Sequence, residues 1–225
     1  MRTVSEGKSG TSGLGAYSKM ALVAWTILIG GLFTWGVTEN YQDTQSLASN
    51  MARAYLDKDH AFRLWGASHG GVYVLITDKT TPSPFLSHVP ERDIETQSGR
   101  KLTLMTPAHM LRQLQEDFFA KSGVKGRITS IKHFRPEAAP DDWEQKALRE
   151  FEKGIPEVSE ITAEGAGSYL RLMKPLKSEK GCLKCHAEQG HKEGDVAGGV
   201  GISLPLKDIL AKQSARTRLL LLSYS

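Results

Sequence analysis

Cys182-Leu183-Lys184-Cys185-His186 is the most informative stretch of this sequence, because a domain that carries a covalent cofactor has to fold around it. Two cysteines three residues apart, followed at once by a histidine, form the motif that attaches a c-type haem. Each thiol adds to one vinyl group of the porphyrin, and the histidine becomes an axial ligand of the iron. We therefore expect a single haem c, with Cys182 and Cys185 as covalent anchors and His186 as the proximal iron ligand.

Other uses of two cysteines explain the motif less well. The chain contains only these two, and a zinc ribbon needs a second pair of ligands at a similar spacing. His186 and His191 would complete a Cys2His2 set only in an awkward geometry, because His186 directly follows Cys185. A thioredoxin-like pair would open a helix after a strand. A simple disulfide in an oxidising compartment remains an alternative.

The N-terminal region predicts a membrane anchor. Residues 20–38 carry no charge, and as a helix they would cover roughly 28 Å, close to the hydrocarbon thickness of about 30 Å. Basic residues precede this stretch and acidic residues follow it: Arg2, Lys8 and Lys19 before, Glu39 and Asp43 after. This asymmetry predicts a single-pass protein of the bacterial inner membrane, with its N-terminus in the cytoplasm and its haem domain in the periplasm.

A cleaved signal peptide is the competing interpretation of this region. It would have a shorter apolar stretch, of about 7–15 residues, and small residues at a cleavage site. The sequence Gly36-Val37-Thr38-Glu39 has no such pattern, so an uncleaved anchor is favoured. Near the other end, Leu219–Leu222 predict the start of a second membrane helix, with an ordinary amphipathic helix end as the alternative.

Composition is typical of a globular domain: 24% of residues are charged and 40% are hydrophobic. The net charge of +4 is small and spread along the chain, and no basic stripe with interleaved aromatic residues is present, so we expect no nucleic-acid partner. The predicted organisation is a cytoplasmic disordered tail (1–18), a transmembrane helix (19–38), a juxtamembrane helix (39–65), a periplasmic haem domain (66–206) and an exit helix (207–225).

Within the outer domain the pattern alternates between strands and helices. Strands are predicted at 72–77, 102–105, 126–134, 157–163, 168–175 and 198–204, and residues 78–100 are predicted to form a long loop. Thr106-Pro107 predicts the start of a helix that runs to about Lys121, and Asp141 caps a helix over 142–153. We expect an α+β, PAS-like domain, with an antiparallel sheet of about five strands flanked by helices and preceded by one transmembrane helix.

Several segments together resemble a family of extracytoplasmic c-type haem-binding sensor domains with a PAS-like fold, formerly a domain of unknown function. The resemblance covers about residues 60–206, and the segments that carry it are 67–74, 90–94, 102–104, 107–110, 128–130, 143–144, 170–176 and 182–190. It implies a sensor input domain of a bacterial membrane protein, placed ahead of a signalling output module that this sequence does not contain.

The sixth iron ligand is less well defined by the sequence. His69 is the first candidate, because it lies beside Gly70-Gly71, where a backbone without side chains lets a flat ligand approach; the resemblance implies that this region forms the far wall of the site. Met110 is the alternative, and a thioether ligand would raise the reduction potential. His109 and an open or water-bound position are also considered.

The haem propionates need a cationic partner. Arg92 and Arg171 are candidates for this contact, because the guanidinium fork matches a carboxylate. Each of them could equally form a surface ion pair. His60, His88, His133 and His191 stand in polar surroundings in the sequence and are assigned no role.

Three functions are compatible with this pattern. In the first, the chain is a redox or gas sensor in which a change of iron ligation, through an electron or a diatomic gas, biases the helices that lead to the membrane. In the second, it is a membrane-tethered cytochrome that passes electrons to a redox partner. In the third, it is a small haem enzyme such as a peroxidase, although no catalytic constellation is recognisable. A sensor with paired membrane helices is expected to be a homodimer.

Overall fold

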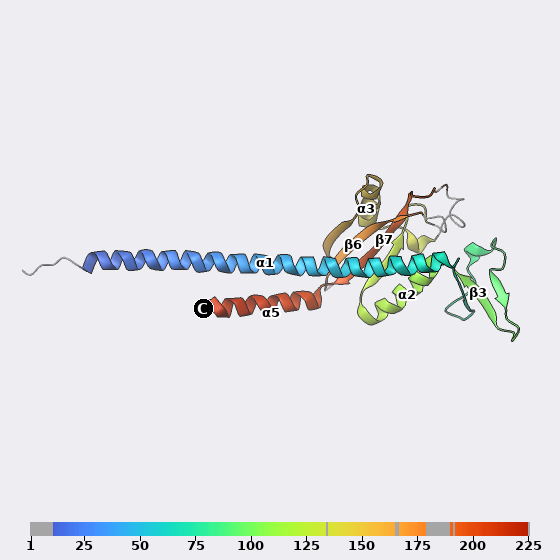
Figure 1. The fold of residues 1–225 in the computed structure, drawn as a ribbon, viewed down its shortest axis with the longest axis horizontal. Coiled ribbons are helices and arrows are strands. Elements are labelled where there is room, and N and C mark those ends of the chain that lie inside the picture. Colours follow the sequence, from blue (N-terminus) through green and yellow to red (C-terminus); the bar gives the residue numbers. More distant parts are fainter. Residues whose placement is uncertain (1–10, 134, 165–166, 179–189, 191, 225) are drawn as a thin grey trace, which may run out of the picture. The chain divides into compact units, whose positions relative to one another are not determined.

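The computed structural model describes residues 11–133, 135–164, 167–178, 190 and 192–224 (Figure 1). It separates into two compact units. Leu47–Lys207 form one, and the residues up to Ser46 together with those from Asp208 form the other. Helices are combined with sheets in which every pair of neighbouring strands is antiparallel. The predicted α+β class is therefore confirmed.

Helix α1 extends over Thr11–Ser68 and contains the predicted membrane stretch. It is long and apolar enough to cross a membrane. Residues 11–18, expected to be disordered, are helical, because extending an existing helix costs far less than starting one. The helix ends where Gly70 and Gly71 adopt positive φ angles of 75° and 100° and the N–H of Gly71 donates to the Gly66 carbonyl oxygen at 2.9 Å.

Within the smaller unit, α1 lies beside helix α5, Lys207–Tyr224. The Asn40 side chain is 3% exposed, and its Nδ2 donates to the Gln213 carbonyl oxygen at 3.3 Å and to Thr217 Oγ1 at 3.1 Å. Two further contacts show that the two helices are antiparallel. Asp43 lies 3.8 Å from Arg216, and a Cβ on Gly36 would lie 3.6 Å from Leu220.

The expected antiparallel sheet is divided into two sheets. The smaller has the order β1-β3-β2 and consists of β1 (Val72–Leu75), β2 (Asp93–Glu95) and β3 (Lys101–Met105). The larger has the order β4-β7-β6-β5 and consists of β4 (Lys125–Thr129), β5 (Val158–Glu164), β6 (Gly167–Lys177) and β7 (Val196–Pro205).

The predicted boundaries differ most from the structure in two places. Residues 78–100 were expected to be a loop, yet they contain the short 3-10 helix η1, Pro84–Leu86, and strand β2, which is too short to show an alternating pattern. Strand β4 ends at Thr129 instead of continuing to residue 134. There Thr129 Oγ1 donates to the Ala138 carbonyl oxygen at 2.7 Å, in the second 3-10 helix η2 (Pro136–Ala138).

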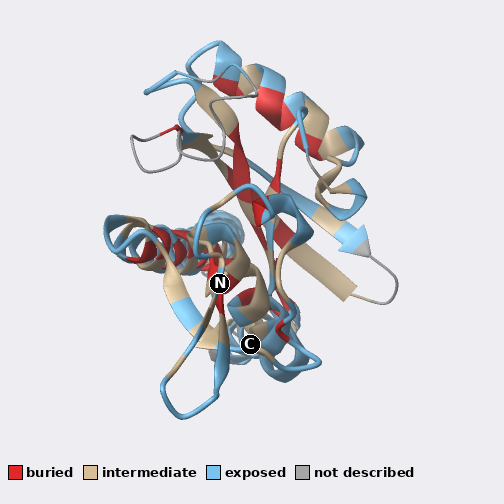
Figure 2. Cartoon of the chain, turned by 90° about the vertical axis from the view of Figure 1, so that its right-hand side faces the viewer, coloured by how far each residue is buried: buried red, intermediate tan, exposed pale blue. Residues whose placement is uncertain are grey.

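Helix α3, Asp142–Glu152, covers β6 and β7. Asp141 and Glu144 form a capping box at its start, which supplies partners for backbone N–H groups that the helix itself cannot pair. Ala147, Leu148 and Phe151 pack against Met173 of β6, and Figure 2 shows buried residues gathered along these strands and this helix. Burial of a side chain such as Phe151 stabilises the fold by about 1.5–3 kcal/mol.

Helix α2, Pro107–Ser122, begins at its predicted cap Thr106 and packs on β4. Several contacts pack the C-terminal part of α1 on α2. Gln115 Nε2 donates to Asp59 Oδ2 at 2.8 Å, the rings of Tyr55 and Phe118 lie 5.6 Å apart, and a Cβ on Gly66 would lie 3.3 Å from Met110 Sδ. These contacts hold the end of α1 close to the N-terminal half of α2, where the main cavity begins.

Candidate functional site

A cavity of about 780 Å³ lies in the larger unit. Several parts of the chain form its walls: the end of α1, η1 with the segment after it, Leu104 of β3, helix α2, β4 with the turn that leads into η2, and the adjoining ends of β6 and β7. Lining residues from these parts include Ala67 and Gly70, Leu86 and His88 to Pro90, Thr106 to Ala108, Gly126 to Ser130, and Leu176 to Ser178 with Ala197 and Gly198.

The haem-attachment motif lies between β6 and β7. Cys182, Cys185 and His186 themselves lie outside the described residues. The two ends of the connecting segment are joined by backbone hydrogen bonds, from Ser178 N to the Asp195 carbonyl oxygen at 2.9 Å and from Gly194 N to the Ser178 carbonyl oxygen at 2.8 Å. Because Ser178 and Ala197 also line the cavity, the segment that carries the motif leaves the sheet and returns to it at the cavity wall.

Most of the cavity wall is apolar. The apolar lining residues are Ala67, Leu86, Val89, Pro90, Leu104, Pro107, Ala108, Ile128, Ala138, Leu176 and Ala197. Gly70 adds a stretch of bare backbone, with nothing within 4 Å of the position that a Cβ would take. Apolar walls with a few convergent polar groups are typical of pockets for cofactors and other small ligands.

Several basic residues bring positive charge to this wall, and two of them, Arg112 and Arg135, are close enough to influence each other. Arg112 comes from α2 and Arg135 from the turn before η2, and both line the cavity. Burial lowers the pKa of the Arg112 guanidinium, and the nearby charge of Arg135 lowers it further, while Glu116, at 3.7 Å, and Glu137 act in the opposite direction. Among the described residues Arg135 has no carboxylate within ion-pair distance. Of the residues that the structure describes, six lysines or arginines and two glutamates line the cavity, so its wall carries an excess of positive charge that suits a carboxylate ligand.

His109 lies close to the same two arginines. Burial lowers the pKa of this imidazole, and the charges of Arg112 and Arg135 lower it further. The ring is therefore neutral near pH 7, and it adds no charge to the arginine pair.

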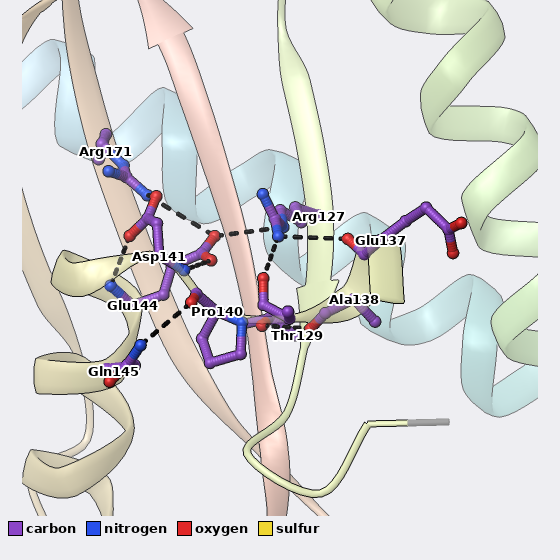
Figure 3. A network of polar contacts seen from close by, with 10 residues as sticks. Arg127, Thr129, Glu137, Ala138, Pro140, Asp141, Glu144, Gln145 and Arg171 are labelled. Carbon is purple, nitrogen blue, oxygen red and sulfur yellow. Dashed lines mark hydrogen bonds and ion pairs between the residues drawn. The ribbon is translucent and has the colours of Figure 1, made fainter. Parts of the chain in front are cut away.

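A second polar network connects the cavity with the cap of α3 (Figure 3). Arg127, which lines the cavity, lies 3.6 Å from Glu144 Oε1, and Arg171 lies 3.6 Å from the same atom and 2.7 Å from Asp141 Oδ2. Burial raises the pKa of the Glu144 carboxyl. For Asp141, burial acts in the same direction, but the Glu144 backbone N–H and the Arg171 guanidinium outweigh it and lower its pKa.

The two arginines proposed from the sequence for the propionates have carboxylate partners in the structure. Arg92 pairs with Asp93, and Arg171 pairs with Asp141 and lies over the Trp143 ring at 4.3 Å. Neither is among the residues that line the cavity. Their contact with a propionate stays a prediction.

The structure also places the two expected sixth ligands away from the cavity wall. His69 is exposed, its Nδ1 lies 2.8 Å from the Trp65 carbonyl oxygen, and its ring packs on Trp65 with centroids 4.7 Å apart. Met110 is buried between α2 and Gly66 of α1. Each of these residues fills a structural role, and the binding of either one to iron stays a prediction.

Among the polar residues of the cavity wall that the sequence analysis did not select are His88, Arg112, His133 and Arg135. His88, His133 and Arg135 stand in polar surroundings in the sequence, and Arg112 lies in a predicted helix, so each resembles an ordinary surface residue. The one local signal is His133-Phe134-Arg135, which lies at the end of the strand predicted at 126–134 and precedes a proline. A histidine and an arginine so close to a strand end could have been chosen as site residues on that basis.

Comparisons with known proteins give one family. No curated protein matches the chain. Among solved structures, the chain is similar to the crystal structure of the cyanobacterial heme-protein Tll0287, at 16% sequence identity and a TM-score of 0.47, over 72% of this chain and 95% of that one. The model of the Tll0287-like domain family, described as Tll0287, matches residues 41–205. The chain therefore belongs to the Tll0287-like domain family.

Proposed function

We propose that the chain is a membrane-anchored sensor input domain that carries one covalently attached haem c in the cavity of its larger unit. The observation that carries this proposal is the position of the motif. The segment with Cys182, Cys185 and His186 starts and ends at the cavity wall, where Ser178 is hydrogen-bonded to Gly194 and Asp195. The family relationship supports the same cofactor, since the Tll0287 protein is a heme-protein.

The described residues fit this cofactor. The cavity volume of about 780 Å³ lies within the range of roughly 300–1,000 Å³ found for small-molecule sites. Its apolar walls suit the porphyrin faces, and the guanidinium groups of Arg112 and Arg135 suit the propionates. In this proposal Cys182 and Cys185 hold the porphyrin edge and His186 binds the iron.

Two continuous pieces of chain connect the cavity with the other unit. Helix α1 contributes Ala67 to the wall and contains the apolar stretch near its N-terminus, and strand β7 contributes Ala197 and Gly198 and leads through Pro205 directly into α5. Bound haem would supply one-electron redox chemistry and affinity for diatomic gases. A change at the cavity wall would therefore act on two helices that contact each other at Asn40.

The membrane arrangement is part of the proposal. Helix α1 is the anchor, with the basic N-terminus in the cytoplasm and the haem unit in the periplasm of a bacterial inner membrane. Leu220 of α5 lies beside Gly36 of α1, next to the apolar stretch, which supports Leu219–Leu222 as the start of a second membrane segment. The functional form would be a homodimer that passes its signal to an output module.

The first test concerns the cofactor. The full chain is produced in a bacterium with an active cytochrome-assembly system, denatured and examined for peroxidase-active pigment on a gel. We expect pigment that stays with the chain. The Cys182→Ala/Cys185→Ala variant, made alongside, should carry none. A wild-type chain without retained pigment would exclude a covalent haem.

The second test separates sensing from electron transfer. Spin labels are placed on the exposed Gln42→Cys of α1 and Ala215→Cys of α5, both in the smaller unit. Label spacing is then compared between oxidised and reduced protein, and with and without nitric oxide. A sensor predicts a change of spacing in at least one comparison. Unchanged spacing together with rapid electron exchange with a redox partner would favour the tethered cytochrome instead.

A further inference from the structure

Two of the described histidines line the cavity, His88 and His133. His133 follows β4 in the turn that leads to η2, and His88 follows η1. The other described histidines, His60, His69 and His109, are not part of the wall. Imidazole is a common axial ligand of haem iron, so these two rings are the candidates that the cavity itself presents.

The hydrogen bond at His133 selects its tautomer. The Nδ1 atom lies 3.2 Å from the Ser130 carbonyl oxygen. A carbonyl oxygen can only accept, so Nδ1 carries the proton and Nε2 keeps its lone pair. Metal-binding histidines almost always donate their second ring N–H to a carboxylate, carbonyl or water, which fixes both the tautomer and the ring orientation. His133 already has this arrangement.

The acceptor is itself held in place. Ser130 Oγ donates to the Ala197 carbonyl oxygen at 2.7 Å, and the Lys132 backbone N–H donates to Ser130 Oγ at 3.2 Å. Ala197 lies at the start of β7, directly after the segment that carries the attachment motif. The turn with His133 is therefore anchored to the part of the wall where the porphyrin would be attached.

His88 lacks this feature. Its ring makes no hydrogen bond to another residue in the part of the chain that the structure describes. It lines the same cavity and is exposed to a similar degree, so it is a matched comparison for His133. Any effect that depends only on losing an imidazole from the wall should be the same at the two positions.

We propose that His133 Nε2 is the second axial ligand of the haem iron, with its Nδ1–H held by the Ser130 carbonyl. This assignment rests on the proposed haem function and makes it more specific. With an imidazole on each face of the porphyrin, the iron is six-coordinate in both oxidation states, and a gas has to displace a ligand before it binds. The domain would then respond to redox state more readily than to a diatomic gas.

The test uses the full chain from the same expression system, with absorption and electron paramagnetic resonance spectra and the reduction potential as readouts. The wild type should be low-spin. His133→Ala should lose the low-spin signal and bind carbon monoxide faster when reduced. His133→Met should stay six-coordinate with a raised potential, because a Met/His pair raises the potential of haem. His88→Ala and His69→Ala should resemble the wild type.

The outcomes separate this assignment from the function on which it rests. A wild-type chain without covalent pigment overturns both. A pigmented wild type whose low-spin signal survives in His133→Ala, or is lost in His88→Ala or His69→Ala, overturns the assignment alone. If His133→Ala yields no folded protein, His133→Met decides, and a potential equal to that of the wild type overturns the assignment.

Discussion

Gly126 of β4 is the position where the packing between α2 and the larger sheet leaves least room. A Cβ there would overlap the Cδ and Nε2 atoms of Gln115 and lie 2.6 Å from its Cγ. Gln115 is 7% exposed, and its Nε2 donates to the buried carboxylate of Asp59 at 2.8 Å. Gly126→Ala therefore has to move a side chain that connects α2 to α1.

The structure gives the size of the effect. If Gln115 moves aside, it loses a hydrogen bond to a charged group, worth about 1.5–3 kcal/mol. If it stays, overpacking costs about 1–3 kcal/mol. Removing a glycine from a strand returns roughly 0.5–1 kcal/mol. We expect Gly126→Ala to lower the free energy of unfolding by about 1.5 kcal/mol, which for a chain of this length corresponds to a melting temperature lower by roughly 3–6 °C.

The assay is thermal unfolding of the full chain in detergent, followed by near-ultraviolet circular dichroism at matched haem content. Gly201→Ala on the neighbouring strand β7 is the control, because its Cβ would meet nothing closer than 3.7 Å, and it should be neutral or stabilising. Gln115→Ala removes the obstructing atoms, so adding Gly126→Ala to that variant should cost nothing further. If Gly126→Ala is equally destabilising with and without Gln115→Ala, overlap with Gln115 is not the cause.

Three further predictions concern helix α3 and are measured by urea unfolding. Glu144→Gln should gain stability relative to the wild type as the pH rises above about 4.5, because the raised pKa of Glu144 lets the folded state hold more protons than the unfolded chain in that window; parallel pH curves would contradict this. Asp141→Ala removes the helix cap and should cost about 0.5–2 kcal/mol, whereas Asp141→Asn should keep most of it, and equal losses would show that the cap is not the cause. Phe151→Ala opens the core against Met173 and should cost about 3–5 kcal/mol, and a loss below 1 kcal/mol would mean that this cluster is not packed as described.

Local signals in the sequence predicted the regular elements well. Thr106-Pro107 and Asp141 predicted the starts of α2 and α3, and the Thr106 and Asp141 side chains cap these helices in the structure. Such caps can be predicted from the sequence because the side chain bonds to a backbone N–H only three residues away. Strand β2 was missed, since its three residues pair with β3 and have no pattern of their own. Its formation depends on a partner strand that a local pattern cannot include.

The candidate site was predictable only where one short motif carries the chemistry. Cys182 to His186 could be selected from their spacing. The cavity wall, by contrast, combines Ala67, Arg112, His133 and Ala197 from four separate elements. What distinguishes His133 from the other histidines is its hydrogen bond to Ser130 and its place on that wall, and both depend on how the chain folds around β4 and η2.

Asn40 has a consequence for how the two helices can move along each other. Sliding α1 past α5 by a single residue, about 1.5 Å, would take its amide away from both Gln213 and Thr217. A buried amide left without partners costs about 1–3 kcal/mol. Small continuous displacements are therefore penalised until the amide meets another acceptor. The two helices should therefore prefer a few discrete relative positions. Under the proposed sensor function, a signal would pass along them as a stepwise change and not as a gradual one.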